Sequence, residues 1–176
     1  MGLPLVVSEY RERKILKSFR VTPVSPLMLL AVEFAIYVVY CLASLLLLLP
    51  AAMLFWGVRI TGSFAAFIGS WLLTMISTLS IGMMVGGVAK NSKSASLIAC
   101  RLYFPMLIFS GATLPFEVMP AAMQKNVSVF PLTQGIKLMK SAFLGLNDGS
   151  LWFPVAVMAA VAIICTVIAV RFFKWE

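Results

Sequence analysis

Long runs of apolar residues, separated by short polar segments, make up most of this chain. Four runs, at 27–49, 63–89, 95–114 and 151–170, each contain at most one charged residue. A helix of about 20 apolar residues is long enough to cross the ~30 Å hydrocarbon core of a bilayer. Because backbone polar groups in lipid must be satisfied within the segment, the pattern predicts four transmembrane helices in an all-α bundle.

The segment 8–20, SEYRERKILKSFR, has a different pattern. Ser8 is placed to act as an N-cap, acidic residues follow it, and basic residues gather toward the end, as a helix dipole favours. Apolar residues recur at helical spacing on one side, at Ile15, Leu16 and Phe19. This pattern predicts a short amphipathic helix that lies along a surface and ends before the prolines that follow.

A third pattern, at 105–145, begins as an apolar run and breaks at Ser110 and Gly111. A helix-like piece at 121–129 follows, and Thr133 is placed to cap a second helix that Gly145 would end. In that second helix one face is apolar and consists of Ile136, Met139 and Phe143. The opposite face is polar and consists of Lys137, Lys140 and Ser141. Neither piece is long enough to cross, so we expect outer re-entrant helices within 115–145.

Charged and small residues inside the runs each have two interpretations. For Glu33, an interfacial carboxylate is favoured over a proton relay, because it lies close to the start of its run. For Arg101, a side chain that reaches back to the interface is favoured over a buried substrate contact. Gly82 and Gly86 form a small-xxx-small pair, for which helix packing within the bundle is favoured over a dedicated dimer face.

Composition excludes an ordinary water-soluble domain: the 176 residues are 62% hydrophobic and 11% charged. We therefore expect one transmembrane domain over 1–176. The net charge of +8 comes from basic residues in short segments between the runs, which indicates membrane topology instead of nucleic-acid binding. The positive-inside rule then places both termini in the cytoplasm and the 114–150 segment outside. There is no histidine, and the three cysteines lie in apolar runs, so neither a metal site nor a disulfide nor another cofactor is expected.

The order of segments resembles a known family. A basic helix ending in Thr-Pro-Val-Ser, two long spans, a short polar loop, then SGATLPFEVMP and FPLTQGIKLMKSAFLG, is similar to the membrane subunit of type 2 ATP-binding cassette (ABC-2) exporters. The resemblance covers nearly the whole chain. It implies a plasma-membrane permease that moves hydrophobic or amphiphilic compounds, such as drugs or lipids, out of the cell. The implied partners are a cytoplasmic ATPase subunit, a second permease copy, identical or different, and membrane lipid.

The resemblance also implies roles for particular residues. Segment 8–20 would be a coupling helix that contacts the ATPase through Glu9, Arg11, Glu12, Arg13, Lys14 and Phe19. An outer gate would comprise Ser110, Gly111, Pro115, Glu117, Pro120, Pro131 and Thr133. Such permeases usually have six spans, so we expect this chain to lack the first span and most of the second, as a fragment, an alternative start or a degraded gene.

Two other classes of function remain as alternatives. A small accessory or scaffold membrane protein would bind partners through its small-residue span and transport nothing. An intramembrane enzyme is disfavoured, because no cluster of catalytic residue types occurs at mid-span. The sequence Gly-x-x-x-x-Gly-Lys-Ser/Thr does not occur, so ATP hydrolysis would have to take place in a separate subunit.

Overall fold

A computed structural model describes residues 2–12, 26–111, 113, 124, 127–145 and 152–172. This part of the chain contains six helices and no strand, in agreement with the predicted all-α class. The helices are α1 (Gly2–Glu12), α3 (Pro26–Trp56), α4 (Phe64–Val88), α5 (Ser92–Ile108), α7 (Pro131–Leu144) and α8 (Trp152–Phe172). Among them α3, α4 and α8 are long and apolar enough to cross a membrane. The expectation of four spans is therefore not confirmed.

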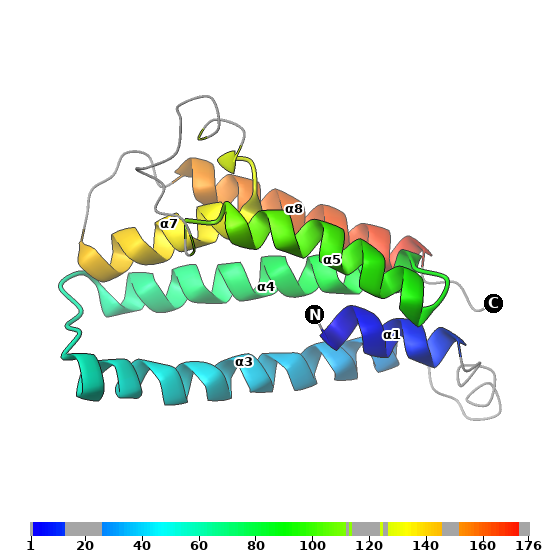
Figure 1. Ribbon diagram of the computed structural model, residues 1–176, viewed down its shortest axis with the longest axis horizontal. Helices are drawn as coiled ribbons and strands as arrows, with labels where there is room; N and C mark the ends of the chain where they lie inside the picture. Colours follow the sequence, from blue (N-terminus) through cyan, green and yellow to red (C-terminus); the bar gives the residue numbers. More distant parts are fainter. Residues whose placement is uncertain are drawn as a thin grey trace.

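Helix α4 is the centre of the bundle. Helices α5, α7 and α8 lie along one side of it and α3 lies on the other (Figure 1). The Ser63 hydroxyl oxygen caps its start by accepting the Ala66 N–H at 3.4 Å, so α4 coincides closely with the second apolar run. Against α8, the Thr166 hydroxyl donates to the Ser80 hydroxyl at 3.2 Å. Small and hydroxyl side chains thus let these two helices approach closely.

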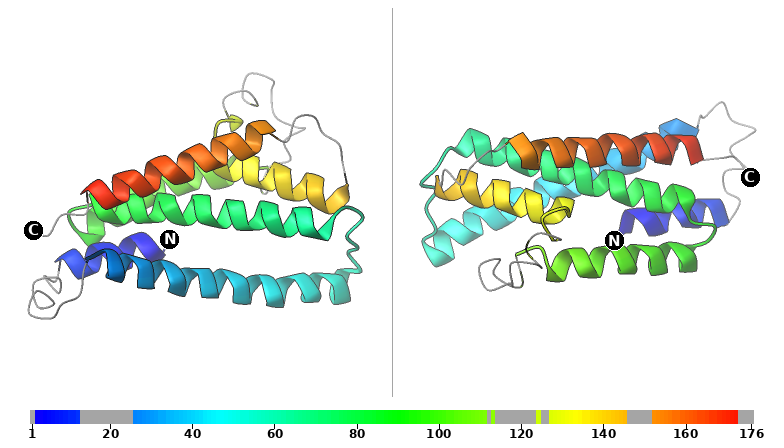
Figure 2. Two further views of the ribbon diagram at one scale, coloured as in Figure 1. Left: turned by 180° about the vertical axis from the view of Figure 1, so that it is seen from behind. Right: turned by 90° about the horizontal axis from the view of Figure 1, so that it is seen from above.

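Helix α3 is longer than its predicted run and packs less. The predicted span ended at residue 49, before Pro50, whereas α3 continues through Pro50 to Trp56. A proline within an apolar helix is tolerated when neighbouring groups satisfy the freed carbonyl. Its first part contributes Leu30, Phe34 and Tyr37 to the core, whereas most large side chains from Val39 onward are exposed. Two further views show α3 at the margin of the bundle, with α1 against its first half (Figure 2).

The prediction that Ser8 is the N-cap of a helix is wrong. Helix α1 starts at Gly2, and Ser8 lies within it, fully buried, with its hydroxyl donating to the Leu5 carbonyl at 2.9 Å. The reason is tertiary: Leu3 and Val7, one turn apart, are buried with residues of three other helices, Leu30, Met83 and Ala169. Helix α1 is thus inserted among α3, α4 and α5, while 13–20 lie outside the described residues.

The predicted run 95–114 does not form a single long helix. Helix α5 begins earlier, at Ser92, and ends at Ile108 after 17 residues. Pro105 lacks the N–H that would bond to the Arg101 carbonyl, and beyond the C-cap Phe109 the chain turns at Gly111, which has φ +86°. Along the long axis, α5 and α7 lie one after the other, each beside one half of α4 (Figures 1 and 2).

Helix α7 differs from its prediction at its start. Its N-cap is Phe130, which makes no side-chain cap bond, and Pro131 occupies the first turn, so Thr133 is not the N-cap. Proline at this position already has the required φ and lacks an N–H that would be unsatisfied there, which replaces the capping signal. Gly145 ends the helix in a left-handed conformation, as predicted, with φ +68°.

The face of α7 that is most deeply buried is also not the predicted apolar one. Thr133, Gln134, Gly135 and Leu138 are buried, whereas Ile136, Met139 and Phe143 are half-buried and line a shallow groove. The buried face is directed at α4, where a Cβ on Gly135 would lie 2.6 Å from Thr74 Cγ2. The absence of a side chain at Gly135 therefore sets the distance between α7 and α4.

Candidate functional site

The apolar half of α1 packs against the two glycines that the sequence singled out. A Cβ on Gly86 would lie 2.8 Å from the Val7 Cβ, and one on Gly82 would lie 3.5 Å from the Leu3 Cδ2. The small-xxx-small pair thus faces a neighbour within the same chain. The four-residue spacing of Leu3 and Val7 was the sequence signal for this face, but so short an apolar piece has no helical pattern of its own.

A hydrogen bond joins the polar half of α1 to α3. The Tyr10 hydroxyl donates to Glu33 Oε1 at 2.9 Å. This bond, followed by desolvation, raises the pKa of Tyr10 above its usual value. The Glu33 carboxylate is half-buried and partnered within the chain. Glu33 thus serves as an acceptor between two helices.

A second bond joins α1 to α5. The backbone N–H of Ser92, the first residue of α5, donates to Glu12 Oε2 at 2.9 Å. At the same helix start, the Asn91 side chain accepts the Ser94 N–H at 2.8 Å. A carboxylate at a helix N-terminus is stabilised by the N–H groups there and by the helix dipole. Two acidic side chains, Glu12 from α1 and Glu33 from α3, therefore connect α1 to its neighbours.

The predicted ATPase contacts are only partly described. Glu9, Arg11 and Glu12 lie in the last turns of α1, whereas Arg13, Lys14 and Phe19 lie outside the described residues. Glu12 contacts α5, a neighbour 80 positions away in sequence that no local pattern identifies.

At the opposite end of α5, the chain turns around the Leu107 carbonyl. This oxygen accepts the Ser110 hydroxyl at 2.8 Å, the Ser110 N–H at 3.4 Å and the Thr113 hydroxyl at 3.2 Å. Carbonyls at a helix C-terminus have no partner within the helix, and hydroxyl groups satisfy this one. Ser110 is buried, so the break between α5 and α7 has a polar interior.

The start of α7 completes this break. The buried Thr133 hydroxyl donates to the Phe109 carbonyl at 3.4 Å, and Pro131 is buried beside it. The Gln134 side chain donates to the Ser128 carbonyl. Of the predicted gate residues, Ser110, Gly111, Pro131 and Thr133 thus lie at the junction of α5 with α7. Pro115, Glu117 and Pro120 lie outside the described residues.

The other end of α7 is held by the connection between α3 and α4. The backbone N–H groups of Thr61 and Gly62 both donate to the Phe143 carbonyl, at 3.1 and 3.0 Å. The ring of Phe143 packs edge to face on Phe67, with centroids 5.5 Å apart. Helix α7 is therefore fixed at both ends, by α5 and by the start of α4.

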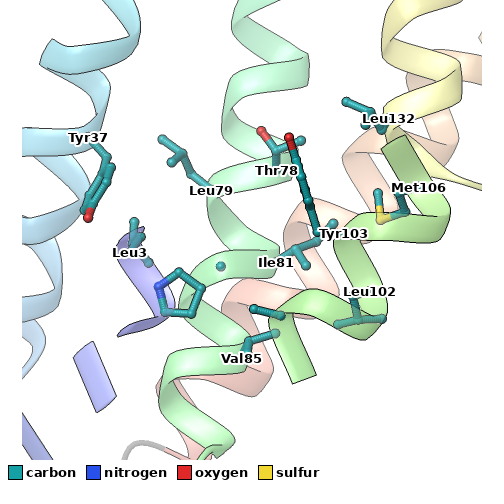
Figure 3. A pocket seen from close by; sticks show the side chains of 13 residues that line it. Leu3, Tyr37, Thr78, Leu79, Ile81, Val85, Leu102, Tyr103, Met106 and Leu132 are labelled. Carbon is teal, nitrogen blue, oxygen red and sulfur yellow. The ribbon is translucent and has the colours of Figure 1, made fainter. Parts of the chain in front are cut away.

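An apolar cavity of about 210 Å³ lies between the start of α1 and the start of α7. It is lined by residues of α1, α3, α4, α5 and α7, which include Leu3, Tyr37, Thr78, Tyr103, Met106 and Leu132 (Figure 3). Hydroxyl groups occur at Tyr37, Thr78 and Tyr103, and the Thr78 hydroxyl donates to the Thr74 carbonyl at 2.8 Å. The cavity extends from the inserted helix α1 to the start of α7.

Three long apolar helices packed with shorter ones define a multi-pass helical membrane protein. The chain belongs to the ABC-2 transporter family, whose sequence model, described as "ABC-2 family transporter protein", matches residues 1–171. This finding confirms the resemblance drawn from the order of segments.

Curated relatives support the same family. The chain is 26% identical over 135 residues to "Inner membrane transport permease YhhJ" of Escherichia coli (strain K12), covering 74% of this chain and 35% of that protein. It is 24% identical over 144 residues to "Probable multidrug ABC transporter permease YbhS" of the same strain, covering 81% and 38%. Over 101 residues it is 29% identical to "Nodulation protein J" of Rhizobium leguminosarum bv. viciae, covering 57% and 36%. The chain thus spans about a third of the length of these relatives. No solved structure matches it.

Proposed function

We propose that this chain forms part of the permease subunit of an ATP-driven exporter that moves hydrophobic or amphiphilic compounds, such as drugs or lipids, across the plasma membrane. The observation that carries the proposal is the match of the ABC-2 family over residues 1–171. Two relatives are named as permeases, and the name of one of them, "Probable multidrug ABC transporter permease YbhS", supports the class of cargo. The apolar cavity with hydroxyl groups is compatible with amphiphilic compounds.

The orientation in the membrane follows from the charges at the two ends of the bundle. The end of α1, the turn between α4 and α5, and the end of α8 lie at one end (Figure 1). Arg11, Lys90, Lys93 and Arg171 are at this end, whereas Arg59, Lys137 and Lys140 lie toward the other. The positive-inside rule supports a cytoplasmic location for the first end, where α1 and α8 end.

The proposed mechanism begins at that cytoplasmic end. A separate ATPase subunit binds the segment from Glu9 to Arg20, and ATP-driven closure displaces α1. Helix α1 is bonded to α3 and α5, and α5 meets α7 at the break near Ser110. In a pair of permease copies, this displacement favours an arrangement in which the break opens an outward path. Such a change requires only that ATP-bound partners bind one of two arrangements more tightly.

Reconstitution tests this function. The full-length protein is purified with the ATPase that associates with it, and ATP-dependent uptake of a fluorescent amphiphile is measured in inverted vesicles. We expect uptake that is lost with a hydrolysis-deficient ATPase. A complex with unrelated membrane proteins, without an ATPase and without uptake, would refute the exporter and support the scaffold alternative.

Charge reversal tests the coupling segment. The double substitution Arg11→Glu and Arg13→Glu should abolish the stimulation of the ATPase while membrane insertion is retained, because the cationic contacts at the cytoplasmic end are reversed. Arg59→Glu, at the opposite end, is the matched control and should leave stimulation unchanged. If the double variant stimulates the ATPase as strongly as Arg59→Glu does, the segment does not have the coupling role.

A further inference from the structure

We propose that Glu12 is a positioning residue that transmits the displacement of α1 to α5, an inference that rests on the proposed exporter function. The resemblance to the family implied a contact between Glu12 and the ATPase. In the structure, Glu12 Oε2 accepts the N–H of the first residue of α5. The carboxylate therefore acts inside the permease, between two of its helices.

The geometry at the start of α5 gives the contact its specificity. The first N–H groups of a helix have no acceptor within the helix. Asn91, the helix's own N-cap, satisfies the N–H of Ser94, and Glu12 satisfies that of Ser92. An ionised acceptor makes a stronger bond than a neutral one and is also favoured by the helix dipole. Helix α5 is thus capped by its own side chain and by one from α1.

Contacts with α3 and α4 fix the part of α1 that precedes Glu12. Val7 is buried against Gly86 of α4, and Tyr10 is bonded to Glu33 of α3. Helices α1 and α5 also pack against each other, and Glu12 adds a hydrogen bond where α1 ends and α5 begins. A displacement of the end of α1 therefore reaches the start of α5 through this bond as well as through their packing.

Helix α5 itself is suited to move as a rod. Its buried residues are the small Ala95 and Ala99, which present a flat surface to the bundle. Packed helices can shift along one another in small steps. At the far end, the Phe109 carbonyl accepts the Thr133 hydroxyl of α7. A shift that enters at Glu12 therefore reaches the break between α5 and α7 through one helix of 17 residues, in which Pro105 lies one turn before the end.

The bond can be removed from either side. Glu12→Ala removes the acceptor, and Glu12→Gln retains an uncharged acceptor. Ser92→Pro removes only the donor, because proline is well tolerated at the first helical position. The preceding residue, Asn91, has φ −150° and ψ 167°, an extended conformation that proline favours before it. Ser92→Ala is the matched control, since it keeps the N–H, and the Ser92 hydroxyl bonds to none of the described residues.

The first measurement is the permease-stimulated ATPase rate of the reconstituted full-length transporter. Glu12→Ala and Ser92→Pro should each lower it by about fivefold, the factor that corresponds to loss of one helix-capping contact. The two substitutions together should lower it no further, because they remove the same bond. Glu12→Gln should retain an intermediate rate, and Ser92→Ala the rate of the unmodified protein.

Two results would overturn the inference. If Ser92→Pro stimulates normally while Glu12→Ala does not, Glu12 acts on the ATPase or elsewhere. If the two losses multiply in the double variant, they arise from different contacts.

A second measurement needs no ATPase and separates this inference from the proposed function. Amide hydrogen exchange at Ser92 should be about fivefold faster in Glu12→Ala than in the unmodified protein, since one capping bond is lost. Unchanged exchange means that the contact does not exist. If the unmodified protein stimulates no ATPase, the proposed function and the transmission from α1 to α5 are both refuted. The amide exchange rate at Ser92 still decides whether Glu12 bonds to α5.

Discussion

Substitution of Gly86 by alanine should weaken the packing of α1 on α4. The new Cβ would lie 2.8 Å from the Val7 Cβ and 3.2 Å from the Pro4 carbonyl oxygen. Both atoms are fixed to the backbone of α1, so the whole helix must move away. Overpacking of this kind costs about 1–3 kcal/mol. Glycine to alanine within a helix gains about 0.5–1 kcal/mol, so the net loss should reach about 2 kcal/mol.

Gly82 provides the matched control one turn earlier on the same face. A Cβ there would lie 3.5 Å from the Leu3 Cδ2 and 3.6 Å from the Pro4 Cδ, which are ordinary contact distances. Neither glycine has a positive φ, so backbone strain does not enter the comparison. Gly82→Ala should therefore gain the helix-propensity term alone. The two variants should differ by about 1–3 kcal/mol in free energy of unfolding.

The assay is unfolding of the purified protein in mixed micelles by increasing sodium dodecyl sulfate, followed by circular dichroism. Gly86→Ala at least as stable as Gly82→Ala would refute the packing of α1 on this face of α4.

Two further predictions concern the connection between α3 and α4 and the hydrogen bond between Tyr10 and Glu33. Gly62→Ala should be less stable than Gly69→Ala in the same titration, because a Cβ on Gly62 would collide with the Ala142 carbonyl, whereas one on Gly69 meets nothing within 4 Å; equal stability would contradict the packing of this connection on α7. Glu33→Gln should lower the pKa of Tyr10 toward its usual value, measured by ultraviolet absorbance with Tyr10→Phe to assign the titration. Because the folded-state pKa is raised, the Tyr10 contact stabilises the fold below about pH 10 and is lost as pH rises through the raised pKa. An unchanged Tyr10 titration in Glu33→Gln would refute the contact.

The three long helices could be predicted from the sequence because length and hydropathy are local properties. Helix α4 follows its apolar run within a residue or two, since Ser63 is a standard N-cap and Lys90 follows the end of the run. The end of α3 could not be predicted in this way. Pro50 marks a helix end in water, but α3 continues through it.

The errors occur where a distant segment changes the meaning of a local signal. Ser8 followed by acidic residues is typical of a helix start, yet the buried contact of Val7 with Gly86 extends the helix back to Gly2. Likewise, Thr133 has the residue type of an N-cap, but its hydroxyl bonds to the end of α5. Each contact joins positions far apart in the sequence, and no periodicity encodes such pairs.

The shortness of α5 has a consequence for how the protein is made. Its 17 residues include Lys93 and Arg101, and an arginine near the middle of a membrane segment opposes insertion by about 3 kcal/mol. Segments that insert alone contain about 20 mainly apolar residues. The hydrogen bonds at the two ends of α5 join it to Glu12, which is synthesised before α5, and to Thr133, which is synthesised after it. During synthesis we therefore expect α5 to take its place only after α7 has left the ribosome, so that insertion does not follow the order of translation.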